Sequence, residues 1–448
     1  MRIVELTKEQ FDQFAKEHPL SSHYQSYYYG ILLSEYYFDY HLIGYVDNND
    51  NIKAASLILT KSITSFHKYG YAPKGFLIDY SDEQLLKAFT NDIKKYFKKR
   101  KCALIKINPD IKIGEIHEDN NYQTTYNQNI HLVEVMKKYG YLKLKNNLYF
   151  EAQFPRFNAI VNLNEFDGLN SVKKNARNKV RKAGRRGLSM VSGTTDDFDQ
   201  FYNLIKNKKK RSKNYYQDYY NSFNKEGFID FHLIRVDYEK FLTSAQQRFA
   251  DEQAKNEELI RLMQENPTEK TIARKMQSDR DLTSYKNDIL VASKNIGTER
   301  SVIIAGALVI KYGKNVSILI SGYDEIFNFL GANYYLHFGL MEYYKNLGYV
   351  YFDMNGITGD FTKENPYYGL NQFKLSFNPN VYEYIGEFDL IIKKRTYKSL
   401  NNNATLAHEF NKPWSKKGDK SESNTPSEET IAKEKPANAP VEKFDDII

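Results

Sequence analysis

The same order of predicted strands and helices occurs twice along the chain, and this repetition limits the folds open to it. Residues 40–62 read as two strands joined by a turn rich in Asn and Asp, and residues 81–108 as an N-capped helix that runs into a strand. Residues 301–313 again read as an apolar strand, and residues 331–356 again as a helix followed by a strand. A chain of 448 residues is too long for one ordinary core. The sequence therefore predicts two similar α/β domains.

The second copy is interrupted by residues 237–296, whose composition differs from the rest. The stretch 237–264 has no glycine or proline, and its apolar residues recur at roughly helical spacing. Pro267 ends this helix, because proline cannot continue a helix interior, and a second helical pattern follows it. Two helices joined by so short a turn must run antiparallel, which predicts a coiled-coil arm of roughly 40 Å. Such an arm serves either as a spacer or dimerisation device, or in handling a substrate.

Changes in composition suggest where the domains begin and end. The polar residues at the C-terminal end, which include the single tryptophan, Trp414, show no periodicity and predict a disordered tail. The predicted segments are a first domain at 1–155, a second domain at 156–236 and 297–385, the arm at 237–296, a segment at 386–398 that returns to the first domain, and the tail at 399–448.

Positive charge is concentrated in one part of the chain. The formal net charge is +8, yet residues 168–195 contain no acidic residue. A charge run is often only a solvated face, but two basic clusters in one predicted domain favour a polyanionic partner. The clusters are Lys173, Lys174, Arg177, Lys179, Arg181, Lys182, Arg185 and Arg186, and then Lys206, Lys208, Lys209, Lys210, Arg211 and Lys213.

Several function classes find no support in the sequence. Residues 1–20 lack the pattern of a signal peptide, and no apolar run reaches the roughly 18 residues of a spanning helix. The single cysteine, Cys102, cannot form an internal disulfide, so a cytoplasmic protein is expected. The nine histidines lack metal-ligand spacing, and neither a GxSxG elbow nor a GxxxxGK[ST] phosphate loop is present. We expect no metal, no other cofactor, and neither hydrolase nor NTPase activity.

A lysine, Lys374, lies within a segment whose apolar and polar residues otherwise alternate, GLNQFKLSFNPN at residues 369–380. The alternation predicts a strand that enters the core. On this pattern alone, Lys374 lies on the polar face of a half-buried strand and points to solvent. The alternative is that Lys374, between Phe373 and Phe377, is a functional cation held by aromatic neighbours.

The duplicated order of strands, helices and hairpins suggests the GNAT acyltransferase fold. A coenzyme A donor would then require a backbone cradle of the form [QR]xxGx[GA] after a central strand. The nearest stretch, RKAGRR at residues 181–186, has arginine at the last position, where a small residue is needed, and lies in a basic helix. A GNAT-type acetyltransferase that uses coenzyme A is therefore kept as an alternative.

Five stretches carry a more specific likeness. They are HYQSYYYGILLSEY, NARNKVRKAGRRGLSM, ISGYDE, FLGANYYLHFGLMEYYKNLGYVYFDMNGITGDFT and GLNQFKLSFNPNVYEYIGEFDLII. In this order and spacing the chain resembles the Fem family of aminoacyl-tRNA-dependent peptidyltransferases, up to about residue 398, and the insertion is similar to the arm of the FemA-like branch. The resemblance implies two GNAT-like domains and transfer of Gly, Ser or Ala from aminoacyl-tRNA to an amine of a peptidoglycan stem peptide or its growing bridge. The acceptor would be a UDP-linked or lipid-linked muropeptide.

The resemblance also implies a site for the aminoacyl donor. The family's Phe-Lys pair, which serves the aminoacyl-tRNA, falls on Phe373 and Lys374. An ammonium held between Phe373 and Phe377 would stabilise the tetrahedral oxyanion of ester aminolysis, or contact a phosphate at the tRNA 3′ end. Tyr323 and Asn355 are expected to line the same cleft, with a packing or turn role as the alternative for each.

A second set of residues is implied for the acceptor. Arg211 followed by Tyr215 has the spacing of the family's pair that holds the acceptor phosphates, with Lys209 or Lys213 as an alternative contact. A lysine expected late in the second helix is missing, and Leu33 stands near its place.

The basic helix would contact either tRNA phosphates or anionic lipid. With a lipid-linked acceptor, the protein is expected to work as a peripheral protein at the inner membrane face. A non-catalytic RNA-binding module is a further interpretation of the same charges. The residues concerned are Lys173, Lys174, Arg177, Arg181, Lys182 and Arg185.

Overall fold

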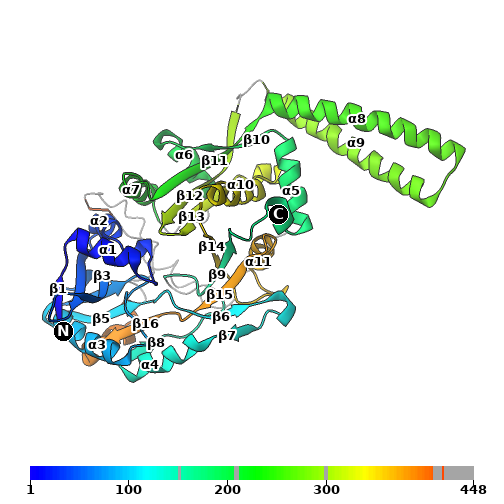
Figure 1. The fold of residues 1–448 in the computed structure, drawn as a ribbon. Helices are drawn as coiled ribbons and strands as arrows, with labels where there is room; N and C mark the ends of the chain where they lie inside the picture. Colours follow the sequence, from blue (N-terminus) through cyan, green and yellow to red (C-terminus); the bar gives the residue numbers. More distant parts are fainter. Residues whose placement is uncertain (150–152, 206–210, 297–300, 407–415, 418–448) are drawn as a thin grey trace.

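The computed structural model describes residues 1–149, 153–205, 211–296, 301–406 and 416–417. The chain forms two β-sheets with helices packed against them, and a pair of long helices projects from one half of the molecule (Figure 1). This arrangement confirms the mixed α/β fold class with two sheets.

The first sheet has seven strands in the order β1-β2-β3-β4-β5-β16-β8. β4 and β5 pair in parallel, and the other neighbours are antiparallel. The strands are β1 (Arg2–Glu5), β2 (Asp39–Val46), β3 (Ile52–Thr64), β4 (His67–Ala72), β5 (Cys102–Ile107), β8 (Tyr141–Lys143) and β16 (Phe388–Ile391).

The second sheet has nine strands in the order β10-β11-β12-β13-β14-β9-β15-β6-β7. Here β13 and β14 form the parallel pair. The strands are β6 (Lys112–Ile116), β7 (Thr124–Tyr126), β9 (Phe157–Asn162), β10 (Leu188–Ser192), β11 (Ile229–Asp237), β12 (Ser301–Tyr312), β13 (Asn315–Tyr323), β14 (Tyr351–Ile357) and β15 (Asn380–Tyr384).

Helix starts follow capping signals that are visible in the sequence. The Thr7 hydroxyl accepts a hydrogen bond from the Gln10 amide N–H, and the Gln10 side chain accepts one from the Thr7 N–H, which forms a capping box. The α-helices are α1 (Lys8–Glu17), α2 (Tyr27–Ser34), α3 (Glu83–Lys99), α4 (Leu132–Lys138), α5 (Lys174–Arg185), α6 (Phe198–Ile205), α7 (Lys213–Asn224), α8 (Tyr238–Glu265), α9 (Glu269–Asn295), α10 (Ala332–Asn346), α11 (Tyr368–Leu375) and α12 (Lys394–Asn402). Short 3₁₀ helices are η1 (His23–Gln25), η2 (Glu118–Asn120), η3 (Gln128–His131), η4 (Gly168–Ser171), η5 (Thr195–Asp197) and η6 (Glu325–Leu330).

The predicted duplication is present in the topology. One half runs β1–α1–α2–β2–β3–β4–α3–β5, and the other runs β10–α6–α7–β11–β12–β13–α10–β14. In both halves four antiparallel strands are followed by a helix and a parallel fifth strand. The arm helices α8 and α9 interrupt only the second copy, between β11 and β12.

The sheets exchange strands, so the domain boundaries stay a prediction. β6 and β7 precede residue 155 but hydrogen-bond within the second sheet, because β6 pairs with β15. β16 lies in the first sheet, between β5 and β8. The start of the predicted tail is not disordered, since α12 continues to Asn402 and Leu406 is buried in a hydrophobic cluster. Trp414 lies outside the described residues.

A shared hydrophobic cluster joins the two halves. It combines side chains of α1, α2 and β3 with those of α6, α7 and β11. The Tyr36 and Tyr215 rings meet across this contact, with centroids 5.4 Å apart, and the Tyr36 hydroxyl donates to Asp218 at 2.8 Å. Lys416 also pairs with Asp218, at 2.9 Å. The relative position of the two sheets is therefore fixed by buried contacts.

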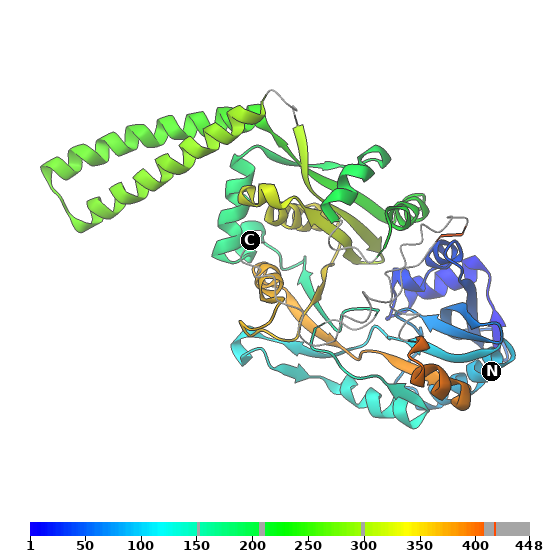
Figure 2. The same ribbon diagram turned by 180° about the vertical axis from the view of Figure 1, so that it is seen from behind.

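The arm consists of α8 and α9 packed side by side, and both views show it projecting away from the sheets (Figures 1 and 2). Its root is fixed by a buried ion pair. Arg186 donates to both carboxylate oxygens of Asp288, at 3.0 and 2.6 Å, and both residues are buried. The antiparallel pair of helices is therefore present, while supercoiling of a coiled coil stays a prediction.

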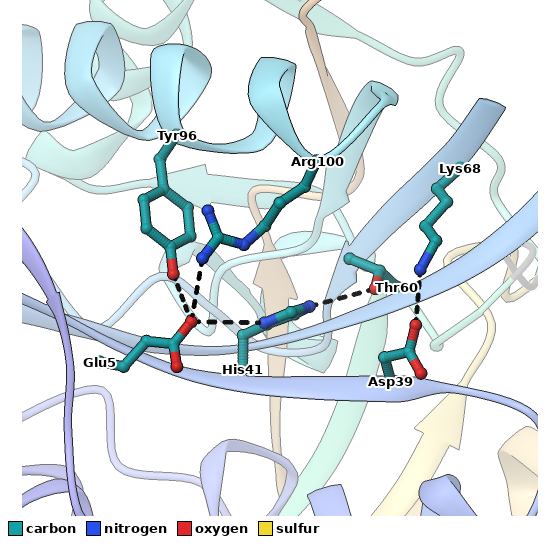
Figure 3. Close-up of polar contacts among 7 residues, drawn as sticks. All are labelled: Glu5, Asp39, His41, Thr60, Lys68, Tyr96 and Arg100. Atoms are coloured by element: carbon teal, nitrogen blue, oxygen red, sulfur yellow. Dashed lines mark hydrogen bonds and ion pairs between the residues drawn. The ribbon is translucent and has the colours of Figure 1, made fainter. Parts of the chain in front are cut away.

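A polar cluster on the first sheet fastens β1 to α3 (Figure 3). The Tyr96 hydroxyl and the Arg100 guanidinium both donate to Glu5, and the His41 ring lies between Glu5 and Thr60. The hydrogen bond from Tyr96 holds the pKa of Glu5 below its usual range, against the opposing effect of burial and with smaller help from His41 and Arg100. Since these groups satisfy one another, the cluster is a structural contact. Asp39 and Lys68 pair beside it at 2.6 Å.

Candidate active site

A cavity of about 470 Å³ lies between the two halves of the molecule. The first half contributes the segment before α2 and residues that follow β4 and β5, and the second half contributes β9, β12, β13 and β14. A cavity of this size is typical of a site for a small ligand or for one part of a larger substrate. Its titratable lining residues include His23, Lys74, Asp110, Lys112 and Asp353.

Asp353 lines the cavity from β14, where it is half-buried. Its Oδ1 accepts the Asn355 amide N–H at 2.7 Å, and its Oδ2 accepts from Asn158 Nδ2 at 2.8 Å. Burial raises the pKa of Asp353 above its usual range, and these two hydrogen bonds, together with the charges of Lys74 and Lys374, oppose the rise. A fixed carboxylate with a raised pKa is suited to accept a proton from a substrate.

Two lysines and a second carboxylate also line the cavity. Lys74 donates to Asp110 at 2.8 Å and lies 4.7 Å from the centre of the Tyr384 ring. The Lys112 ammonium lies 3.8 Å from the centre of the Tyr382 ring, and burial lowers the pKa of Lys112. Partly desolvated ammonium groups are suited to bind carboxylates or phosphates of a ligand.

His23 lines the cavity from η1 as a neutral ring. Burial, with a smaller effect of Lys74, lowers the pKa of His23 to about 3. Its ring centroid lies 3.9 Å from that of Tyr24, and its Nε2 has no hydrogen-bond partner among the described residues. A buried polar atom without a partner is unusual, and here it adds a hydrogen-bonding group for a ligand.

The cavity borders a split in the second sheet. β13 and β14 pair only over residues 315–317 and 351–353, after which β13 continues along β12 and β14 along β9. Asn355 lies just past this point with φ 66°, in the left-handed region that asparagine tolerates. Its Nδ2 donates to the Ile318 carbonyl oxygen at 3.2 Å, across the split. Asn355 lines the cavity, and a role for it in binding a substrate stays a prediction.

The predicted strand around Lys374 is wrong, because Tyr368–Leu375 form helix α11. The buried amide of Asn371 anchors the helix by donating to Thr358 Oγ1 at 2.8 Å, and Lys374, one turn later, faces the same interior. The solvent-facing reading of Lys374 is also wrong, since the residue is 6% exposed. Its ammonium donates to the carbonyl oxygens of Met354, at 2.8 Å, and Gly356.

Phe373 and Phe377 pack against α10, while the Lys374 ammonium bonds to backbone carbonyl oxygens of β14. The Phe373 ring meets the rings of Tyr334 and His337, with both centroid distances 4.9 Å, and the Phe377 ring at 5.4 Å. Tyr323, at the end of β13, packs against the hydrophobic cluster of the second sheet that contains Phe377. None of the residues Phe373, Lys374, Phe377 and Tyr323 lines the cavity. Of these residues, Lys374 lies directly behind Asn355, because its ammonium bonds to the carbonyl oxygens of the residues on both sides.

Helix α5 carries the first basic cluster and lies next to α11. The Lys173 amide N–H donates to the Ser376 carbonyl oxygen at 2.8 Å, while the Lys173 ammonium pairs with Glu118 at 2.5 Å. Arg177 donates to the Val172 carbonyl oxygen, and Arg186 is buried against Asp288, so neither guanidinium is a simple surface charge. The exposed members are Lys174, Arg181, Lys182 and Arg185. The RKAGRR stretch lies at the end of this helix, so it forms no loop for coenzyme A.

The residues implied for the acceptor phosphates lie elsewhere. The Arg211 guanidinium is 5.8 Å from the centre of the Tyr215 ring, and Tyr215 is buried at the contact of α2 with α7. Lys213 pairs with Asp199, and Lys209 lies outside the described residues. Leu33 is fully buried in α2, so its side chain packs in the core. Neither Arg211 nor Tyr215 lines the cavity, and their role stays a prediction.

The FemAB family model matches residues 6–404. The chain belongs to the FemAB family. Two curated relatives are lipid II:glycine glycyltransferases of staphylococci. The protein from Staphylococcus epidermidis strain RP62A is 23% identical over 414 residues, which cover 89% of this chain and 94% of the relative. The protein from Staphylococcus aureus is 23% identical over 418 residues, which cover 89% and 95%. The family resemblance of the sequence motifs is therefore confirmed.

A solved structure shares the fold. The crystal structure of FemX matches with a TM-score of 0.67 at 20% identity, over 89% of this chain and 100% of FemX. At this level of identity the match establishes the arrangement of strands and helices. The activity has to be argued from the residues of the site.

Sequence reasoning missed most of the groups that line the cavity of this FemAB-family chain. Asp353 lies in β14 and Asp110 follows β5, and these are corresponding strands of the two repeats. The sequence did contain one signal for this pair, namely an aspartate in or just after the corresponding strand of each repeat. Ligand-binding groups often lie at the ends of such strands. His23 and Lys74 gave no such signal, because only the packing of the two halves brings them to the cavity.

Two other features bear on the kind of site. Among the residues that the structure describes, no group of three or more His, Cys, Asp or Glu side chains could hold a metal ion. Within the same residues, every helix is too short or too polar to cross a bilayer.

Proposed function

We propose that this protein transfers an aminoacyl group from aminoacyl-tRNA to an amine of a peptidoglycan precursor, and that this precursor is lipid-linked. The observation that carries the proposal is the cavity between the sheets, where Asp353 has a raised pKa and Lys74 and Lys112 line the same space. The relatives named lipid II:glycine glycyltransferases, which align over 89% of the chain, support this reaction and this acceptor.

The cavity suits the peptide part of such an acceptor. Its volume of about 470 Å³ takes a few residues of a stem peptide and not a whole muropeptide. Lys112 is placed to bind a peptide carboxylate, because its ammonium is partly shielded from water by the Tyr382 ring, whereas Lys74 is already paired with Asp110. The acceptor amine then lies next to Asp353. The reacting nitrogen is therefore at the point where β14 separates from β13.

The first step of the reaction is removal of a proton from the acceptor amine, and this step requires a proton acceptor. A primary amine is mostly protonated near neutral pH, and only its neutral form is nucleophilic. Asp353 takes one proton from the ammonium, and the nitrogen then attacks the ester carbonyl carbon of the aminoacyl donor. A C–N bond forms, the C–O bond to the tRNA ribose breaks, and the second nitrogen proton passes to the leaving ribose oxygen. The products are an amide and a free tRNA hydroxyl.

A reconstituted transfer assay tests the proposed function. The purified protein is mixed with total tRNA charged separately with labelled Gly, Ser or Ala, and with either lipid-linked or UDP-linked muropeptide. We expect label in the lipid-linked acceptor, and we expect ribonuclease treatment of the charged tRNA to abolish it. Label in the UDP-linked acceptor alone would refute the lipid-linked assignment. No transfer with any pair, while a staphylococcal relative is active in the same mixture, would refute the reaction.

We propose Lys374 as a positioning residue. Its ammonium holds the backbone on both sides of Asn355, and its charge lowers the pKa of Asp353. Lys374→Met should reduce kcat/KM by about 10- to 100-fold, because small displacements at a reacting centre have effects of that size. It should also move the acid limb of the pH profile to higher pH, since the Asp353 carboxylate loses a stabilising cation.

Lys345→Met is the matched control for this change. Lys345 also donates from its ammonium to a backbone carbonyl oxygen, that of Phe166, but it does not line the cavity. Its loss should leave the acid limb in place. A Lys374→Met protein with an unchanged pH profile would show that Lys374 does not act on Asp353.

A further inference from the structure

The C-terminal half of helix α5 presents a stripe of positive charge to solvent. Arg181, Lys182 and Arg185 are exposed, and at 100° per residue they lie within a single face of the helix. Ala176, Val180 and Ala183 are buried on the opposite face. The orientation of the stripe is fixed, because α5 packs against α10 and its neighbour Arg186 is tied to Asp288.

The stripe lacks counter-charges of its own. In the described parts of the chain, no carboxylate lies within 4 Å of the side-chain nitrogens of Arg181, Lys182 or Arg185. The nearby carboxylate of Asp288 is already shared by Arg186 and Arg248. Burial and the charge of Arg186 lower the pKa of Lys182, which is consistent with an excess of positive charge here. The surface therefore favours an anionic partner.

Exposed apolar side chains also lie in η6, which contacts α5. Ile326 is 79% exposed, the highest value among the large apolar side chains of the described residues, and Phe329 is 46% exposed. The Arg186 guanidinium lies 5.6 Å from the centre of the Phe329 ring and donates to the Phe329 carbonyl oxygen, so η6 abuts the end of α5. One acidic residue of this turn, Glu325, is also exposed.

We propose that Arg181, Lys182, Arg185, Ile326 and Phe329 form a docking surface for an anionic lipid bilayer. Cations on a helix face attract acidic headgroups, and neighbouring apolar side chains enter the boundary between headgroups and acyl chains. Structured RNA is the other polyanion to weigh. It is bound through phosphates and by stacking of bases on planar side chains, and a protruding isoleucine gains little from either contact. The combination of charges with Ile326 therefore favours lipid.

Sedimentation with lipid vesicles tests the docking surface on the full chain. We expect binding to vesicles of equal parts phosphatidylglycerol and phosphatidylcholine, and none to vesicles of phosphatidylcholine alone. Replacing Arg181, Lys182 and Arg185 together by Gln should weaken binding on the order of a hundredfold, since each basic residue near an anionic surface adds about fivefold. Ile326→Ser should weaken it by about tenfold, through lost apolar burial.

Matched controls separate this surface from general effects of charge and exposure. Lys87, Lys98 and Lys99 are exposed on α3, which lies at the first sheet, away from α5 (Figure 1), and their joint replacement by Gln removes the same charge. Phe66→Ser removes another strongly exposed apolar side chain, 72% exposed. Both controls should bind vesicles like the unmodified protein.

Three outcomes would overturn the proposal. The first is equal binding of the unmodified protein to both kinds of vesicle, and the second is an equal loss of vesicle binding in the control variants. The third is a triple Gln variant that binds vesicles like the unmodified protein but has lost affinity for deacylated tRNA. The last would assign the surface to RNA. The assay contains no acceptor or charged tRNA, so its result is independent of the proposed transfer reaction.

Discussion

Asp353→Asn should lower kcat/KM for aminoacyl transfer by about 10²- to 10⁴-fold, the usual contribution of a positioned general base. The amide cannot take a proton from the acceptor amine. The fold should tolerate the change, because Asn158 Oδ1 has no hydrogen-bond partner among the described residues and can accept from the new amide after the Asn158 side chain rotates. The measurement is the rate of label transfer, together with the thermal unfolding temperature as a test of folding.

The pH profile of transfer gives a second, independent readout of Asp353. The reaction requires the ionised carboxylate, and burial raises the pKa of Asp353, so the acid limb of kcat/KM should lie above the pH expected for an ordinary aspartate. This limb should be absent from the residual activity of the Asn variant. Asp39→Asn is the control, because Asp39 is an exposed carboxylate paired with Lys68 outside the cavity (Figure 3). Full activity of Asp353→Asn would eliminate the proton-acceptor role.

Asp288→Ala should lower the free energy of unfolding by about 3–5 kcal/mol, because it leaves a buried guanidinium without its carboxylate. Arg186 and Asp288 are each 3% exposed, and Arg186 makes two hydrogen bonds to Asp288. Arg248 also approaches Asp288, at 3.7 Å, so a second cation loses its partner. Denaturant-induced unfolding measures the effect.

Two further variants separate a buried unpaired charge from a general weakness of the arm. Arg186→Met with Asp288→Leu removes both charges and should recover stability to within about 2 kcal/mol of the original protein. Lys275→Ala breaks an exposed pair with Asp279 on the same helix and should cost less than about 1 kcal/mol. An Asp288→Ala protein that unfolds at the original denaturant concentration would rule out the pair as the anchor of the arm.

The segment 369–380 shows why a local pattern was misleading. Its apolar residues alternate like those of a strand, yet Tyr368–Leu375 form a helix. The deciding contacts are made by polar side chains, since Asn371 bonds to Thr358 and Lys374 bonds to the carbonyl oxygens of Met354 and Gly356. The two carbonyl oxygens lie in β14 just past the point where it separates from β13. No pattern within twelve residues contains that information.

The sequence by itself determined the α/β fold class, the duplication and the antiparallel helices of the arm. These follow from capping residues and from the spacing of apolar residues, which act over a few turns of chain. The tertiary structure alone decided the site. His23, Lys74, Asp110 and Asp353 are far apart in sequence and meet only because a shared hydrophobic cluster presses the two halves together. A raised pKa at Asp353 and a buried Lys374 are likewise properties of that packing, because desolvation depends on the neighbours that the folded chain supplies.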